Sequence, residues 1–203
     1  FLAGTHWGVF IDDTGSPGNN TYKYLPSGRK TWLSVIIPPS QIKSSYLNLN
    51  GLLSELNKMC GITELHFKDI FGGSKEFRDV AWEIRLGIIH TLVQGFINYQ
   101  YTIIHQSLDE NQRPEWKKKL GLPERLDLFN FNKVEDTALF ILLTKLQIHL
   151  KEAQKNENGK AHVFIDEGWK KNGKAIFGEH VFGNGFDRGK VCFGSSKDII
   201  FIQ

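Results

Sequence analysis

A repeated tetrapeptide constrains this chain more than any other feature of its sequence. Val9-Phe10-Ile11-Asp12 recurs as Val163-Phe164-Ile165-Asp166, and a second acidic residue follows each copy. Three apolar residues that end in an acid predict a strand buried on both faces, whose last residue emerges where the sheet stops. If the two strands lie parallel and adjacent, Asp12 and Asp166 come out side by side at one edge of the sheet. Two carboxylates crowded there repel each other, and a bound divalent cation removes that repulsion.

Each acid also has a simpler interpretation, in which its side chain only caps the turn after its strand. This interpretation suits either copy alone, whereas both copies together with a third acid, Glu64, favour a shared metal site. Glu64 opens an alternating segment, Glu64-Leu65-His66-Phe67-Lys68. As an extended segment it places Glu64, His66 and Lys68 on one face. The alternative for Glu64 is a position on the solvated face of an edge strand.

Apolar periodicity along the rest of the chain predicts an α/β fold with a mixed sheet covered by helices on both faces. The first two strands should pair antiparallel across a long hairpin, and Gly61 should end the first helix. The expected strands are residues 7–12, 31–37, 96–105, 163–166 and 190–193. The expected helices are residues 42–59, 74–92 and 134–154, with a terminal helix opening at Ser195-Ser196.

Length and composition suit a single domain over residues 1–203. Of the 203 residues 40% are hydrophobic, and the formal net charge of +3 permits contact with a polyanion without demanding it. No apolar run reaches the length of a membrane span, so we expect none. Cys60 and Cys192 have neither metal-ligand nor disulfide spacing, which indicates reduced thiols in a cytoplasmic protein.

Two stretches depart from the pattern of a compact domain. Residues 106–130 are polar and irregular, and we expect an inserted polar arm because ordinary connections are shorter. The apolar run Ile199-Ile200-Phe201-Ile202 stops at Gln203 without a terminating signal. That ending predicts a chain truncated at its C-terminus.

The acids Asp12, Glu64 and Asp166 come from separate elements and are the candidate catalytic residues. Mg²⁺ takes oxygen ligands and is usually held by one or two carboxylates together with water and substrate phosphate. Two such ions stabilise both the attacking and the leaving oxygen in phosphodiester cleavage. We therefore expect Asp12, Glu64 and Asp166 to bind Mg²⁺ or Mn²⁺.

Several cations are candidates for contact with a nucleic-acid substrate. His66 and Lys68 would orient the scissile phosphate, and Lys170 and Lys171 would bind the flanking backbone. The run Lys117-Lys118-Lys119 beside Trp116 offers further phosphate contacts and a stacking surface. Such charge runs are more often solvated faces, and that alternative stays open.

Four short motifs resemble those of the domain-of-unknown-function 3800 family, in the right order and over nearly the whole chain. Ile11-Asp12-Asp13-Thr14-Gly15 resembles its I-D-E-S-G opening, with Asp13 and Thr14 in place of Glu and Ser. Glu64-Leu65-His66 resembles its second block and Phe164-Ile165-Asp166-Glu167 its third. Phe193 to Gln203 resembles the approach to its closing Q-x-A-D block, whose aspartate would follow Gln203.

The resemblance implies an RNase H-like fold and a metal-dependent nuclease with Asp12, Glu64 and Asp166 as metal ligands. Our leading hypothesis is therefore an RNase H-like phosphodiesterase that acts on nucleic acid. The alternative is a non-catalytic RNase H-like module that binds nucleic acid or a protein partner. A haloacid-dehalogenase-like phosphatase would need an acid-x-acid motif, whereas Asp12 and Asp13 are adjacent and point to opposite sides.

Overall fold

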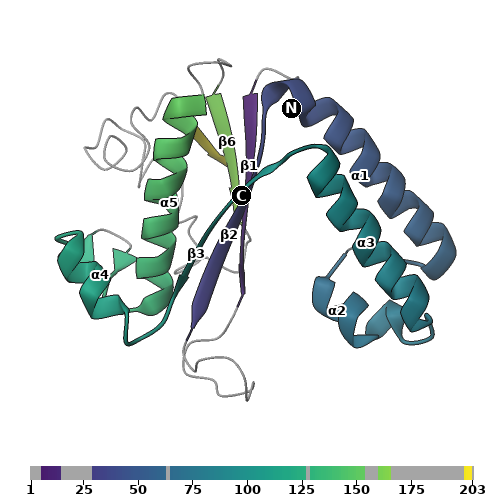
Figure 1. Ribbon diagram of the computed structural model, residues 1–203, viewed down its shortest axis with the longest axis horizontal. Helices are drawn as coiled ribbons and strands as arrows, with labels where there is room; N and C mark the ends of the chain where they lie inside the picture. Colours follow the sequence, from purple (N-terminus) through teal and green to yellow (C-terminus); the bar gives the residue numbers. More distant parts are fainter. Residues whose placement is uncertain are drawn as a thin grey trace. The chain divides into compact units, whose positions relative to one another are not determined.

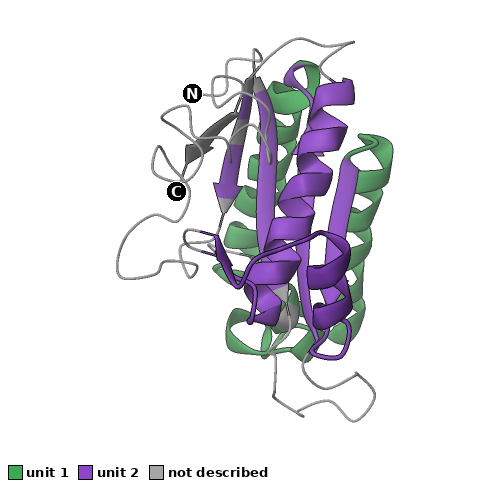
Figure 2. Cartoon of the chain, turned by 90° about the vertical axis from the view of Figure 1, so that its left-hand side faces the viewer, with its two compact units in different colours: residues 1–4, 40–101 green, residues 5–39, 102–203 purple. Residues whose placement is uncertain are grey.

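The chain forms two compact units, shown in different colours in Figure 2. The computed structural model describes residues 6–14, 29–62, 65–126, 129–153, 160–165 and 199–202. A helical unit contains Ser40–Tyr101, and a sheet unit contains Thr5–Pro39 and Thr102–Gln203. The helical unit is thus inserted in the chain between two strands of the sheet unit. The single domain over residues 1–203 stays a prediction.

The sheet unit is built on a five-stranded mixed sheet, so the expected mixed α/β class is confirmed. Its strand order is β3-β2-β1-β6-β7. The pairs β1–β2 and β2–β3 are antiparallel, whereas β1–β6 and β6–β7 are parallel. The strands are β1 (His6–Thr14), β2 (Lys30–Ile37), β3 (Thr102–Leu108), β6 (Lys160–Ile165) and β7 (Ile199–Ile202).

The two copies of the tetrapeptide are neighbours in this sheet. Val9 pairs with Val163, Phe10 with Phe164 and Ile11 with Ile165. The two phenylalanine rings stack, with their centroids 4.8 Å apart. The two strands are therefore parallel and adjacent, which is the condition under which Asp12 and Asp166 would emerge side by side.

We expected β1 to be buried on both faces, and this expectation is wrong for one of them. Val9 and Ile11 are buried, but Phe10 between them is 37% exposed. Because side chains alternate along a strand, Val9 and Ile11 share the face that is covered by a helix and Phe10 stands on the other.

The covering helix is α5 (Val134–Ala153), which packs on β2 and β3 (Figure 1). The helix predicted over residues 134–154 is thus confirmed. Its buried side chains join Trp32, Val9 and Val163 in one hydrophobic core. The indole Nε1 of Trp32 also donates a hydrogen bond to the carbonyl of Glu135 (3.0 Å), which fixes the start of the helix against β2. Helices on the opposite face of the sheet stay a prediction.

Residues 106–130 are less irregular than we expected. They contain the end of β3, helix α4 (Arg113–Lys119) and a two-stranded sheet of β4 (Arg125–Leu126) and β5 (Phe129–Asn130). Phe129 is buried in the core, and Trp116 packs against that core. These apolar anchors are spaced too widely to give a periodic signal in the sequence.

The helical unit contains α1 (Pro39–Cys60), α2 (Phe67–Gly72), the 3-10 turn η1 (Lys75–Phe77) and α3 (Trp82–Asn98). Gly61 ends α1 with a positive φ of 71°, as predicted, and its N–H donates to the carbonyl of Asn57. A second core forms among these helices from Leu56, Ile62, Ile70, Phe77 and Ile88.

Four boundaries differ from the sequence-based expectation. The segment expected to be extended through Lys68 turns helical at Phe67, so His66 and Lys68 do not alternate along a strand. The helix expected from residue 74 begins only at Trp82, after η1, and it runs to Asn98. The strand expected from residue 96 therefore begins at Thr102. Residues 199–202 form β7 rather than part of a terminal helix.

Among the residues that the structure describes, no helix has the length and apolar character needed to cross a membrane. The other strand expected near the C-terminus, residues 190–193, lies outside the described residues.

We expect the contact between α5 and the sheet to dominate the stability of the sheet unit. Leu142→Ala removes a fully buried side chain from α5 and should lower the free energy of unfolding by about 2–5 kcal/mol. Ile148→Ala on the same helix is the matched control, since Ile148 is 67% exposed and its loss should cost less than about 0.5 kcal/mol. Urea unfolding followed by tryptophan fluorescence measures both. Equal losses would contradict the packing of α5 described above.

Candidate carboxylate site at the end of β1

Asp12 lies near the carboxyl end of β1, where it pairs with Leu33 of β2. It is exposed, and alternation along the strand places it on the same face as Phe10. Its Oδ1 accepts a hydrogen bond from the backbone N–H of Asp13 (2.8 Å). This local bond is the kind that the capping interpretation requires, and it leaves the metal-binding interpretation open.

The partner strand β6 ends at Ile165, opposite Ile11. The last paired residues of the two strands are therefore those that immediately precede Asp12 and Asp166. Asp166 itself, together with Glu64, Lys170 and Lys171, lies outside the described residues.

Lys30, which the sequence did not single out, lies beside Asp12. Its ammonium pairs with the carboxylate of Asp13 and lies 5.4 Å from the centre of the Trp32 ring. Burial lowers the pKa of Lys30 below its ordinary value of 10.5, while the charges of Glu135 and Asp12 oppose that decrease. Asp12, Asp13 and Glu135 thus all act on one ammonium group, and we call these three carboxylates the acidic edge.

Glu135 reaches this edge because of the direction of α5. Since β6 is parallel to β1 and follows α5 in the chain, the helix begins at the edge where β1 ends. Glu135 lies in the first turn of α5, where the helix dipole favours a negative charge. Its Oε1 is 3.9 Å from Nζ of Lys133. The only sequence signal for Glu135 was an acid in the first turn of a helix that precedes the second tetrapeptide.

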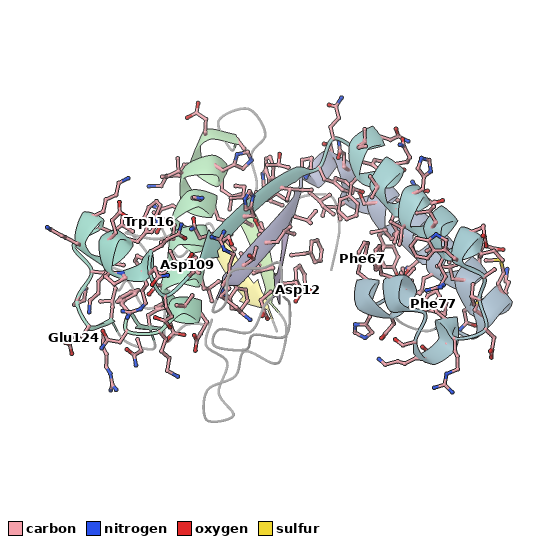
Figure 3. The ribbon with its side chains drawn as sticks, turned by 60° about the horizontal axis from the view of Figure 1, so that its bottom comes forward. Asp12, Phe67, Phe77, Asp109, Trp116 and Glu124 are labelled. Carbon is pink, nitrogen blue, oxygen red and sulfur yellow. The ribbon has the colours of Figure 1, made fainter. Side chains whose placement is uncertain are left out.

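A second ion pair fixes the neighbouring end of β3. Arg29 Nη2 lies 3.2 Å from Oδ2 of the buried Asp109, and Arg29 Nη1 donates to Oγ of Ser107 (3.3 Å). The other carboxylate oxygen of Asp109 accepts the backbone N–H of Gln112 (2.8 Å), just before α4. Figure 3 labels Asp12, Asp109 and Trp116 of this unit. Asp109 therefore ties β2, β3 and the start of α4 together.

His66 belongs to the helical unit, where it precedes α2. Its backbone is extended, and its carbonyl accepts the N–H groups of Asp69 (2.9 Å) and Ile70 (3.1 Å). Lys68 lies within α2, but its side chain is outside the described part of the structure. Because His66 and Asp12 are in different units, their grouping in one site stays a prediction.

Arg85 of α3 holds the end of α2 in place. Its Nη1 donates to the carbonyls of Ile70 (3.0 Å) and Phe71 (3.1 Å), and its Nε donates to that of Val80. These bonds satisfy carbonyl groups that the short helix leaves without partners in its own last turn. Helix α2, which contains Lys68 and directly follows His66, is thereby held against α3.

Within the described ranges, no group of three or more His, Cys, Asp or Glu side chains is close enough to hold a metal ion. Two of the three expected ligands, Glu64 and Asp166, are not among those ranges. The metal site therefore stays a prediction.

Comparisons with protein-family models, with curated proteins and with solved structures find no match to this chain. The resemblance to the domain-of-unknown-function 3800 family rests on the sequence motifs given above and stays a prediction.

The link between Lys30 and Glu135 can be tested directly. Glu135→Gln removes a negative charge near the ammonium and should lower the pKa of Lys30 further, because the charged form loses a favourable interaction. Glu152→Gln is the control, since Glu152 lies 17 residues further along α5, about 25 Å away at 1.5 Å per residue. Lysine Nζ signals followed by NMR during a pH titration report the pKa. A pKa unaffected by Glu135→Gln would contradict the acidic edge.

Proposed function

We propose that this protein is a metal-dependent phosphodiesterase that cleaves nucleic acid by an RNase H-like carboxylate mechanism. The observation that supports it most is the register between β1 and β6, in which Ile11 pairs with Ile165. Continued by one residue, that register would set Asp166 opposite Asp12. Neighbouring strands lie about 4.8 Å apart, a spacing at which two carboxylates can share a divalent cation.

The sheet supports the RNase H-like part of the proposal. Three antiparallel strands, β1 to β3, are followed by helix α5 and by β6, which returns parallel to β1. The family resemblance implies an RNase H-like fold with Asp12 as a metal ligand, and Asp12 lies near the carboxyl end of β1.

The donor chemistry of the acidic edge fits Mg²⁺ or Mn²⁺. Oxygen ligands are what these ions prefer, and a carboxylate of this edge, that of Asp13, already pairs with the Lys30 ammonium. Asp12, Asp166 and Glu64 would hold the ions. When bound, such ions activate the attacking water and stabilise the charge on the leaving oxygen.

The chain's own cations would place the substrate. His66 and Lys68 would orient the scissile phosphate, and Lys170 and Lys171 would hold the flanking backbone. Each role needs a positively charged or hydrogen-bonding group near a phosphate oxygen. Histidine and lysine side chains have such groups.

A non-catalytic module that binds nucleic acid or a protein partner is the second candidate. The observation that favours it is the ion pair of Lys30 with Asp13, which neutralises part of the acidic edge without any metal. Calorimetry with Mn²⁺ separates the two candidates, because an inert module should show no binding that depends on Asp12.

Asp12→Asn tests the proposed mechanism. The variant keeps the size of the side chain but loses its charge, so metal-dependent cleavage of nucleic acid should fall at least about a hundredfold, or roughly 3 kcal/mol of transition-state stabilisation. Because Asp12 is exposed, the thermal unfolding midpoint should change little.

Glu152→Gln is the matched control for this loss, since it removes an exposed acid at the far end of α5. Its cleavage rate should stay near that of the wild type. Equal rates for Asp12→Asn and the wild type would remove Asp12 from the mechanism.

A further inference from the structure

A group of cations gathers around α4 in the sheet unit. Residues 113–133 contain six Lys or Arg and three Asp or Glu, so these 21 residues carry a net charge of +3, equal to that of the whole chain. We call five of them the α4 basic surface: Lys117, Lys118, Lys119, Arg125 and Lys133. All except the half-buried Lys117 are exposed.

Contacts within this segment join the elements that carry the five residues. Nζ of Lys117 donates to Oδ1 of Asn132 (3.0 Å), next to Lys133 in the chain. Arg125 on β4 pairs with Asn130 on β5, and the carbonyl of Asn130 accepts the N–H of Lys133 (2.8 Å). The five charges therefore belong to one local structure rather than to a flexible tail.

The base of this surface is anchored in the core. Phe129 and Phe131 are buried and stack on each other, and Trp116 packs against the same cluster. Arg113 Nη1 donates to the carbonyl of Phe131 (3.2 Å), which ties α4 to the segment before α5. Charges on an anchored element lose less conformational freedom when they bind, so more of their attraction is retained as affinity.

Trp116 is only partly accessible for stacking on a base. Its ring is half-buried, and Nζ of Lys119 lies 4.9 Å from its centre. The surface therefore presents charges for a phosphate backbone rather than a platform for bases, and binding there should not depend on base sequence.

The α4 basic surface begins beside the acidic edge. Lys133 lies 3.9 Å from Glu135, and Glu135 acts on the ammonium of Lys30 next to Asp12. Asp109 holds the start of α4 to the ends of β2 and β3, at the same edge of the sheet. A polyanion that enters the acidic edge with one phosphate would meet these cations with its neighbouring phosphates.

We propose that the α4 basic surface binds the phosphate backbone that flanks the scissile bond of the nucleic-acid substrate. The identity of the partner rests on the proposed function. The physical driving force is the release of condensed counterions from the backbone, which makes the affinity fall steeply with salt.

The test measures binding without cleavage. The full-length Asp12→Asn chain is titrated in EDTA against fluorescein-labelled oligonucleotides of about 20 nucleotides, at salt between about 50 and 200 mM. Single-stranded DNA, single-stranded RNA and an RNA–DNA duplex form three arms, because all present the same phosphate chemistry. The oligonucleotide that binds most tightly identifies the class of nucleic acid whose phosphates this surface prefers.

Lys118→Gln/Lys119→Gln in the same background removes two exposed charges. If each lysine contacts one phosphate, the negative slope of log affinity against log salt should become less steep by about 1.8 for duplex or about 1.4 for single strands. Lys145→Gln/Lys151→Gln is the matched control, since it removes two exposed charges from α5 and should leave the slope unchanged. Thermal unfolding midpoints equal to that of the parent show that both variants are folded.

Two results would overturn the proposal. One is an unchanged slope for Lys118→Gln/Lys119→Gln, and the other is equal competition by polyglutamate, which would assign the surface to an acidic protein. A chain that binds as described but never cleaves would contradict the proposed function and leave this surface supported. A chain that cleaves while the Lys118→Gln/Lys119→Gln variant binds like its parent would contradict the surface alone.

Discussion

The parallel pairing of β1 with β6 is the interaction on which the rest of the structure depends. Val9, Ile11 and Val163 are buried in one core with side chains of α5, and in this register Val9 pairs with Val163 and Ile11 with Ile165. A slip of one residue would bring the wrong set of side chains under the helix. The hydrophobic effect therefore excludes a slip of one residue, and the observed register decides which residues end the two strands together.

The same pairing fixes the electrostatics of that edge. Because β6 returns parallel to β1, the helix before it must begin where β1 ends, and this brings Glu135 near Lys30 and Asp13. The bond from Trp32 to the carbonyl of Glu135 holds the start of the helix there. Burial of the half-buried Lys30 disfavours its charged form, and the carboxylates offset that cost only in part, since its pKa stays below the ordinary value.

The sequence predicted those elements whose apolar pattern is long and regular. Helices α1 and α5 and strands β1 and β2 have such patterns, and the structure confirms them. Residues 96–101 alternate like a strand, yet α3 continues to Asn98. Packing within the helical unit decides that boundary, since Phe96 and Tyr101 contact edge to face there.

The site was predictable only in part, for a physical reason. Asp12 ends a tetrapeptide that is repeated in the sequence, whereas Lys30 and Glu135 are 105 residues apart and share no motif. Their proximity follows from the strand order and the direction of α5, which no local pattern specifies. The cations of α4 were visible as a charge run, but their position beside the acidic edge depends on Asp109, Asn132 and Lys133.

The central claim is that a divalent cation binds where β1 and β6 end. Mn²⁺ added to the ¹⁵N-labelled full chain tests it most directly, because a bound paramagnetic ion broadens nearby amide signals. The account predicts the strongest broadening at Asp12, Asp13 and Glu135, and a decrease along β1 toward His6, which lies about 20 Å from Asp12 at 3.3 Å per residue. It also predicts that Asp12→Asn abolishes the effect. Uniform broadening along β1, or broadening that survives in Asp12→Asn, would contradict it.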